Sequence, residues 1–190
     1  MKYDNETKKD LNSLFEKYLE ESFKHIKKTF KYLVPTVEIS LVVSLCKLLE
    51  AMFAAGNFKG LEYTFVFCCV WAFGSGFSEK DNREYRKEFS NWWKDKWKSV
   101  KFAAKGTVFD YYVDIENTRL EEWNKLNTKD IDSLIDTSKP ISSFTVPTVD
   151  TISAQFLMKK YIGVGYSPLL VGMAGCGKTQ IIKGMLNEMT

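Results

Sequence analysis

The feature that most constrains the fold is a glycine-rich stretch close to the C-terminal end of the sequence. It reads Gly172-Met173-Ala174-Gly175-Cys176-Gly177-Lys178-Thr179 and follows a short apolar run at residues 168–171. The stretch matches the phosphate-binding loop G-x-x-x-x-G-K-[ST] at every required position. Because glycines lack Cβ, such a backbone can wrap closely around a phosphate, and its N–H groups add to the positive end of a following helix. We therefore expect a strand at 168–171, the loop, and then a helix over 178–188.

The side chains of the loop indicate its chemistry. Lys178 is placed to reach the β- and γ-phosphates of a nucleotide, and the Thr179 hydroxyl to ligate Mg²⁺. We predict ATP or ADP with Mg²⁺ as the cofactor and Thr179 as the metal ligand. The predicted nucleotide-binding residues are Gly172, Met173, Ala174, Gly175, Cys176, Gly177, Lys178, Thr179 and Gln180. A chance match is the alternative, expected in about one random chain in two hundred of this length. A redox role for Cys176 is the weaker hypothesis, since its motif position is variable.

Composition excludes several classes of protein. Hydrophobic residues make up 45% of the 190 residues and aromatics 15%, enough for a packed core. The net charge is only +3, and residues 83–101, with seven Lys/Arg against three Asp/Glu, carry +4 of it, which leaves about −1 elsewhere. We therefore expect no nucleic-acid binding. The longest apolar run, residues 65–73, is too short to cross a membrane, and the polar start argues against a signal peptide. One histidine and four scattered cysteines argue against a zinc site.

Helical periodicity dominates the first half. Apolar residues recur at helical spacing over residues 11–33, with His25 on the polar, exposed side. Thr36 is the expected N-cap of a second helix that closes at Gly56. Residues 61–73 are apolar on all sides and are longer than a typical strand, which favours a buried helix.

A fourth helix is expected to begin at Asp81, with an aromatic face and a basic face. The aromatic residues recur at steps of three to five and are Tyr85, Phe89, Trp92, Trp93 and Trp97. This period favours a face turned into the core over a surface that stacks nucleic-acid bases. Four successive helices predict a small helical bundle.

The pattern changes at Gly106. Residues 107–113 favour a strand, 114–117 a turn and 119–123 a second strand, which together predict a β-hairpin. Residues 124–143 are polar and read as a linker. Pro147 and Thr148 then open a helix that runs to Tyr161. The predicted fold is α-rich with a small α/β portion.

Several long motifs resemble dynein heavy chains. They are residues 63–74, 85–93 and 106–114, together with 146–151 leading to 169–172. The last pair is similar to the start of the third AAA+ module of those proteins. The resemblance extends from about residue 10 to the end and is strongest toward axonemal, outer-arm heavy chains.

The resemblance implies a domain organisation. Residues 1–105 would be the helical small subdomain of the second AAA+ module, 106–143 the hairpin and linker, and 144–190 the start of the next large subdomain. It also implies that the adenine lies near Phe144, Val146, Pro147, Thr148 and Thr151. The implied partners are neighbouring AAA+ modules and the rest of the heavy chain, with intermediate chains, light chains and microtubules reached through the parent. The implied location is the cytoplasm, the cytoskeleton and the ciliary axoneme.

Three functions remain open from the sequence. The first is an ATP-binding part of a motor ATPase that lacks the acidic strand, sensor and arginine needed for hydrolysis, since only eleven residues follow Thr179. The second is a non-hydrolysing structural or interaction module whose helical part packs in a larger assembly. The third, a small nucleotide kinase, is disfavoured because it would need a continuous core after the loop.

Overall fold

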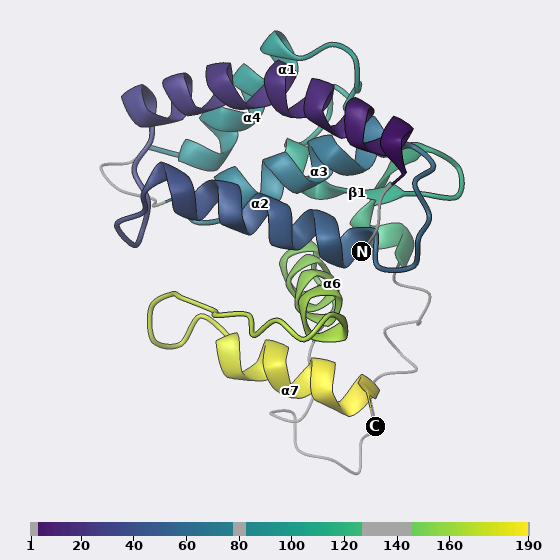
Figure 1. The fold of residues 1–190 in the computed structure, drawn as a ribbon. Helices are drawn as coiled ribbons and strands as arrows, with labels where there is room; N and C mark the ends of the chain where they lie inside the picture. The colour runs from purple at the N-terminus through teal and green to yellow at the C-terminus, as the bar shows by residue number, and fades with distance from the viewer. Residues whose placement is uncertain (1–3, 78–82, 127–145, 190) are drawn as a thin grey trace. The chain divides into compact units, whose positions relative to one another are not determined.

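The computed structural model describes residues 4–77, 83–126 and 146–189. The chain divides into two compact units, Met1–Glu121 and Glu122–Thr190. Among the described residues, the first holds helices α1 to α4 and a β-hairpin, and the second holds helices α6 and α7 and the glycine-rich loop. Figure 1 shows these elements in chain order, from purple to yellow. The predicted α-rich fold and its β-hairpin are confirmed.

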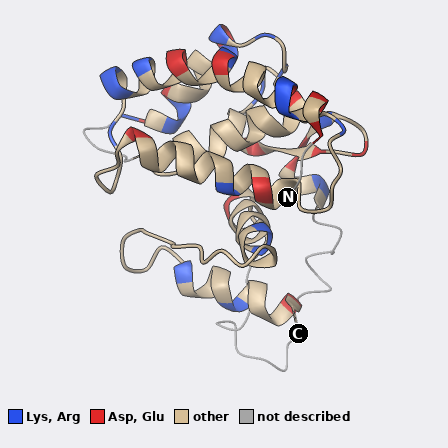
Figure 2. Ribbon diagram, viewed as in Figure 1, with Lys and Arg blue, Asp and Glu red and all other residues tan. Residues whose placement is uncertain are grey.

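Helix α1 spans Asn5–Thr29, beginning and ending earlier than predicted. It begins early because the Asp4 carboxylate accepts a 2.6 Å hydrogen bond from the Thr7 amide, an N-cap that hydrophobic periodicity does not reveal. It ends early because Tyr32 forms an antiparallel bridge with Phe77, which draws the chain out of the helix. Its buried stripe includes Tyr18, Ser22 and Ile26, spaced by one turn. Acidic and basic residues are interspersed along this helix (Figure 2).

Helix α2 spans Glu38–Met52, and its predicted N-cap is wrong. The cap position is Val37, which makes no side-chain capping bond. The Thr36 hydroxyl instead donates to the carbonyl of Val34 at 2.8 Å, a local turn that competes with capping. Gly56 closes the following turn at φ +72°, with its amide 2.8 Å from the Phe53 carbonyl.

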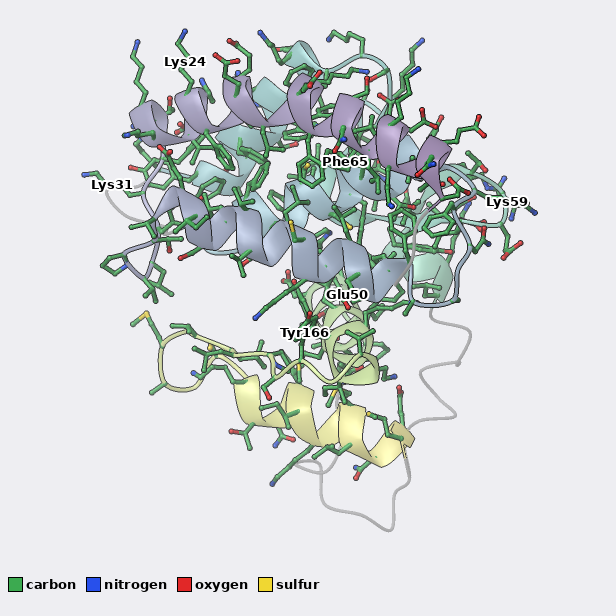
Figure 3. All side chains as sticks on the ribbon, viewed as in Figure 1. Lys24, Lys31, Glu50, Lys59, Phe65 and Tyr166 are labelled. Atoms are coloured by element: carbon green, nitrogen blue, oxygen red, sulfur yellow. The ribbon has the colours of Figure 1, made fainter. Side chains whose placement is uncertain are left out.

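Helix α3 spans Leu61–Gly74 and confirms the prediction of a buried helix. It packs against α1 and α2, between which it lies in Figure 1. Phe65 on α3 is fully buried and meets Phe15 of α1 edge to face, with ring centroids 5.1 Å apart. By contrast, Lys24, Lys31 and Lys59 point outward from this unit (Figure 3). A helix covered on all sides has no polar face, which explains why periodicity could not identify it.

Helix α4 spans Tyr85–Lys96, and the predicted start at Asp81 lies outside the described residues. Tyr85, Phe89 and Trp93 are buried, as the inward-facing aromatic prediction requires. Trp92 and Trp97 are only half-buried. Trp92 covers His25 of α1, so the prediction that His25 is exposed is wrong: its ring is half-buried in an aromatic stack.

The predicted hairpin is confirmed, with shorter strands. A 3-10 turn, η1 (Val108–Asp110), precedes β1 (Tyr111–Asp114), which pairs with β2 (Arg119–Glu122). The first strand starts late because Thr107 and Asp110 form a reciprocal capping box that bends residues 107–110 into η1. A second 3-10 turn, η2 (Trp123–Leu126), occupies the start of the predicted linker, and residues 127–143 lie outside the described residues.

The second unit contains α6 (Val149–Gly163) and α7 (Lys178–Met189), both close to prediction. Thr148 is the N-cap of α6, as expected. The predicted strand at 168–171 is wrong, since these residues have no regular secondary structure. A strand needs a hydrogen-bonded neighbour, and the two strands of the described residues pair only with each other. Leu169 is consequently 85% exposed.

Candidate nucleotide-binding site

The backbone of the glycine-rich loop has the shape that its sequence predicts. Gly175 and Gly177 adopt φ values of +82° and +83°, a region that side chains with a Cβ strongly disfavour. Gly172 has a different requirement, because a Cβ there would lie 2.9 Å from the Cys176 sulfur. The loop runs directly into α7, whose first residue is Lys178. Tight curvature ahead of a helix N-terminus is the arrangement that binds phosphate.

Lys178 folds back over the loop that precedes it. Its Nζ donates hydrogen bonds to the carbonyl oxygens of Gly172, at 3.0 Å, and Met173, at 2.6 Å. The same ammonium lies 3.4 Å from the Cys176 sulfur. The side chain of Lys178, at the end of the loop, is therefore hydrogen-bonded to the backbone at the start of the loop. In this arrangement its positive charge lies within the curve formed by the predicted phosphate ligands.

The other predicted loop residues are open to solvent. Met173 is 81% exposed, and Ala174, Cys176 and Thr179 are also exposed. Gln180 is half-buried in the first turn of α7. Thr179 offers one hydroxyl, and no group of three or more His, Cys, Asp or Glu side chains that could hold a metal occurs among the described residues. A Mg²⁺ ion here would need phosphate and water oxygens for its remaining ligands, its usual partners in nucleotide sites.

The predicted adenine residues form a second hydrogen-bonded group. The Thr148 amide donates to the Thr151 hydroxyl at 2.8 Å, and the Thr151 amide donates back to the Thr148 hydroxyl at 3.3 Å. The Thr151 hydroxyl also donates to the Val146 carbonyl at 3.0 Å. Val146 is 61% exposed and Pro147 is half-buried. Phe144 lies outside the described residues.

Helix α6 connects the hydrogen-bonded residues 146–151 with the helix that follows the glycine-rich loop. The Gln155 side-chain amide donates to the Ile181 carbonyl of α7 at 3.1 Å. Further along, Lys159 pairs with Glu188 of α7 at 2.5 Å. Gln155 is not among the site residues predicted from the sequence. Its position four residues after Thr151, on the same face of the helix, was the available signal.

The helical unit carries a separate polar cluster that joins α1, α3 and the segment after α4. The Tyr18 hydroxyl donates to Glu62 at 2.7 Å and lies 2.8 Å from the Ser99 hydroxyl. Lys17 donates to the same two partners, at 2.6 and 3.0 Å. Burial raises the pKa of Tyr18. Burial also acts to raise the pKa of Glu62, but hydrogen bonds from Lys17 and Tyr18 outweigh it and lower that pKa. The cluster contains no residue of the predicted site.

Comparison with protein families identifies this helical unit. Residues 11–125, more than half of the chain, match the dynein heavy chain AAA lid domain. The chain belongs to the dynein heavy chain family. Residues 134–190 match the P-loop containing dynein motor region, which includes the glycine-rich loop and α7.

Individual dynein heavy chains align along nearly the whole sequence. The dynein alpha chain of the flagellar outer arm of Chlamydomonas reinhardtii is 35% identical over 185 residues, covering 94% of this chain. Human dynein axonemal heavy chain 9 is 34% identical over 186 residues, covering 95%. The ciliary dynein beta chain of Heliocidaris crassispina is 35% identical over 187 residues. The chain spans about 4% of the length of each of these relatives. None of the described helices is long and apolar enough to span a membrane.

Proposed function

We propose that this chain is a nucleotide-binding part of a dynein heavy chain motor region and that Gly172 to Thr179 hold the phosphates of ATP or ADP with Mg²⁺. The observation that carries the proposal is the loop itself. Two glycines at positive φ turn the backbone immediately before α7, and Lys178 lies within the resulting curve. The match of residues 134–190 to a P-loop-containing motor region supports this assignment.

Each residue has a defined task in the proposed site. The loop amides and the N-terminus of α7 surround the phosphates. Lys178 exchanges its bonds to the carbonyls of Gly172 and Met173 for the β- and γ-phosphate oxygens. Thr179 ligates Mg²⁺, which neutralises phosphate charge when bound. Gln180 completes the first turn of the helix. The base lies against residues 146–151, where the exposed side chain of Val146 offers an apolar surface.

The place of the chain within the heavy chain is also a proposal. We assign residues 1–105 to the small subdomain of the second AAA+ module, 106–143 to the hairpin and linker, and 144–190 to the start of the third large subdomain. Hydrolysis also requires an acidic residue that positions water and an arginine, which other parts of the heavy chain would supply. Relatives named as flagellar, ciliary and axonemal dyneins support a location in the ciliary axoneme. Microtubules and the intermediate and light chains would be partners of the whole protein.

The decisive experiment is a titration of the 190-residue chain with MgADP, followed through the backbone amide signals of Gly175, Gly177 and Thr179. We expect these signals to shift and Lys178→Ala to raise the Kd about tenfold or more, since a charge-assisted contact contributes about 1.5–3 kcal/mol. Lys183→Ala, on the exposed surface of α7, is the matched control and should leave the Kd unchanged. Equal affinities of wild type and Lys178→Ala would contradict the site.

One observation favours a second function, an interaction module. Five apolar side chains in the segment after α1 and in the first two turns of α2 are 44–66% exposed, namely Leu33, Val34, Val37, Ile39 and Val43. Such a patch is typical of a surface covered by a partner. Loop amide signals that stay unchanged at millimolar MgADP would favour this function over nucleotide binding.

A further inference from the structure

One face of helix α6 contacts both the predicted base-binding segment and the predicted phosphate-binding helix. Thr148 and Thr151 form the capping box at its N-terminus. Gln155 follows Thr151 by four residues and Lys159 follows Gln155 by four, so these residues lie in one row along the helix. One turn of helix, about 5.4 Å, separates successive members of the row. Contacts at the base segment and at α7 are therefore fixed by a single rigid element.

Gln155 makes its hydrogen bond at the N-terminal end of α7, next to the phosphate loop. Its amide donates to the carbonyl of Ile181, which lies three residues after Lys178. The amide of Ile181 donates in turn to the carbonyl of Gly177 at 3.0 Å. A single residue of α7 thus accepts a bond from α6 and makes a bond to the phosphate loop. Gln155 is part-buried, so its bond competes little with water.

Other described residues of α6 and α7 interact further along α7. Met158 of α6 and Met185 of α7 are buried, and their flexible apolar side chains tolerate sliding. Lys159 and Glu188 form an ion pair near the end of α7, where both side chains are about 40% exposed. Exposed pairs contribute little to stability. Gln155 thus holds the carbonyl of Ile181, one turn after the start of α7, through a part-buried hydrogen bond.

We propose that Gln155 is a positioning residue of the nucleotide site, which sets the distance between the base-binding segment at the start of α6 and the phosphate loop before α7. The proposal rests on the proposed function. A ligand that touches both places depends on this distance, whereas a ligand that touches only the loop does not. The expected signature of Gln155 is therefore a preference for nucleotide over bare phosphates.

The test compares MgADP with magnesium pyrophosphate as ligands of the 190-residue chain and of Gln155→Met, which keeps the side-chain length and removes the donor. We expect the Kd for MgADP to rise about three- to tenfold, the range for one hydrogen bond. The Kd for pyrophosphate should change less than about twofold. Because partial unfolding would weaken both ligands equally, the ratio of the two constants is independent of the folded fraction.

Two variants complete the design. Gln155→Glu replaces the donor by an acceptor that repels the Ile181 carbonyl, and it should lower the preference for MgADP over pyrophosphate at least as much as Gln155→Met. Lys183→Met, at an exposed position of α7, is the control and should change neither Kd. An unchanged ratio in Gln155→Met, or equal weakening of both ligands, overturns the positioning role. If Lys178→Ala binds pyrophosphate as tightly as wild type, the phosphate site itself is wrong, so the two failures are distinguishable.

Discussion

The imidazole ring of His25 lies flat on the indole ring of Trp92, with ring centroids 4.2 Å apart and planes inclined by 8°. The two residues come from α1 and α4, and Phe30 covers the imidazole edge at 5.4 Å. Burial lowers the pKa of His25, and the positive charge of Lys28 lowers it further. The folded state thus favours the neutral form of His25, the single histidine of the sequence.

This stack predicts a pH dependence of stability. Because the pKa is lower in the folded state, the unfolded chain binds more protons between the two values. The stability contributed by neutral His25 is present above the unfolded value of about 6.5 and is lost as pH falls through it toward the folded value. We expect Trp92→Ala to raise the pKa of His25 toward 6.5, measured on its C2 proton by NMR. Lys9→Ala, near the start of α1, should leave it unchanged. An unaltered pKa in Trp92→Ala would refute the role of the stack.

The close approach of Gly74 to Phe109 predicts a steric effect. A Cβ on Gly74 would lie 2.4 Å from Cζ of the buried Phe109 ring. Gly74→Ala should therefore destabilise the helical unit by about 1–3 kcal/mol, the usual cost of overpacking. Urea unfolding followed by tryptophan fluorescence measures the change. Phe109→Leu removes the clashing atoms, so the double variant should be more stable than the sum of the two single changes predicts. Additive effects would show that the clash is not the cause.

The polar cluster around Tyr18 predicts a loss of stability without a change in shape. Its hydroxyl bonds to Glu62 and Ser99 from a fully buried ring. Tyr18→Phe should lower the free energy of unfolding by about 1–2 kcal/mol, because the Glu62 carboxylate loses a donor. Tyr63→Phe on α3 is the control, with an expected change below about 0.5 kcal/mol. Equal stabilities of Tyr18→Phe and wild type would mean that water replaces the lost bonds.

The capping box of α6 predicts a difference between two small substitutions at Thr151. Thr151→Val keeps the shape but removes the oxygen that accepts from the Thr148 amide, whereas Thr151→Ser keeps that oxygen. We expect Thr151→Val to destabilise the first turn of α6 by about 1 kcal/mol, seen as faster hydrogen exchange of its amides. Thr151→Ser should exchange close to the wild-type rate. Similar exchange in the two variants would contradict the cap.

Features that depend on neighbouring residues in the chain could be predicted from the sequence. The sequence predicts Thr148 as the N-cap of α6 and places α7 directly after the glycine-rich loop, since capping chemistry and the loop motif act over a few residues. The helical spacing of Tyr85, Phe89 and Trp93 likewise indicated which face of α4 is buried. The family resemblance rested on the same local motifs.

The tertiary structure decided the features that need a distant partner. The residues at 168–171 have strand-forming character but no strand beside them among the described residues, so they form none. Helical periodicity predicts His25 on the polar face of α1, yet Trp92 of another helix covers it. Gln155 gains its contact only because α7 packs across α6. A sequence read one segment at a time specifies helix boundaries and loop chemistry, because these depend on bonds within a turn or two. Burial, pairing and the contact between the two helices of the site depend on which surfaces meet, and only the folded chain determines that.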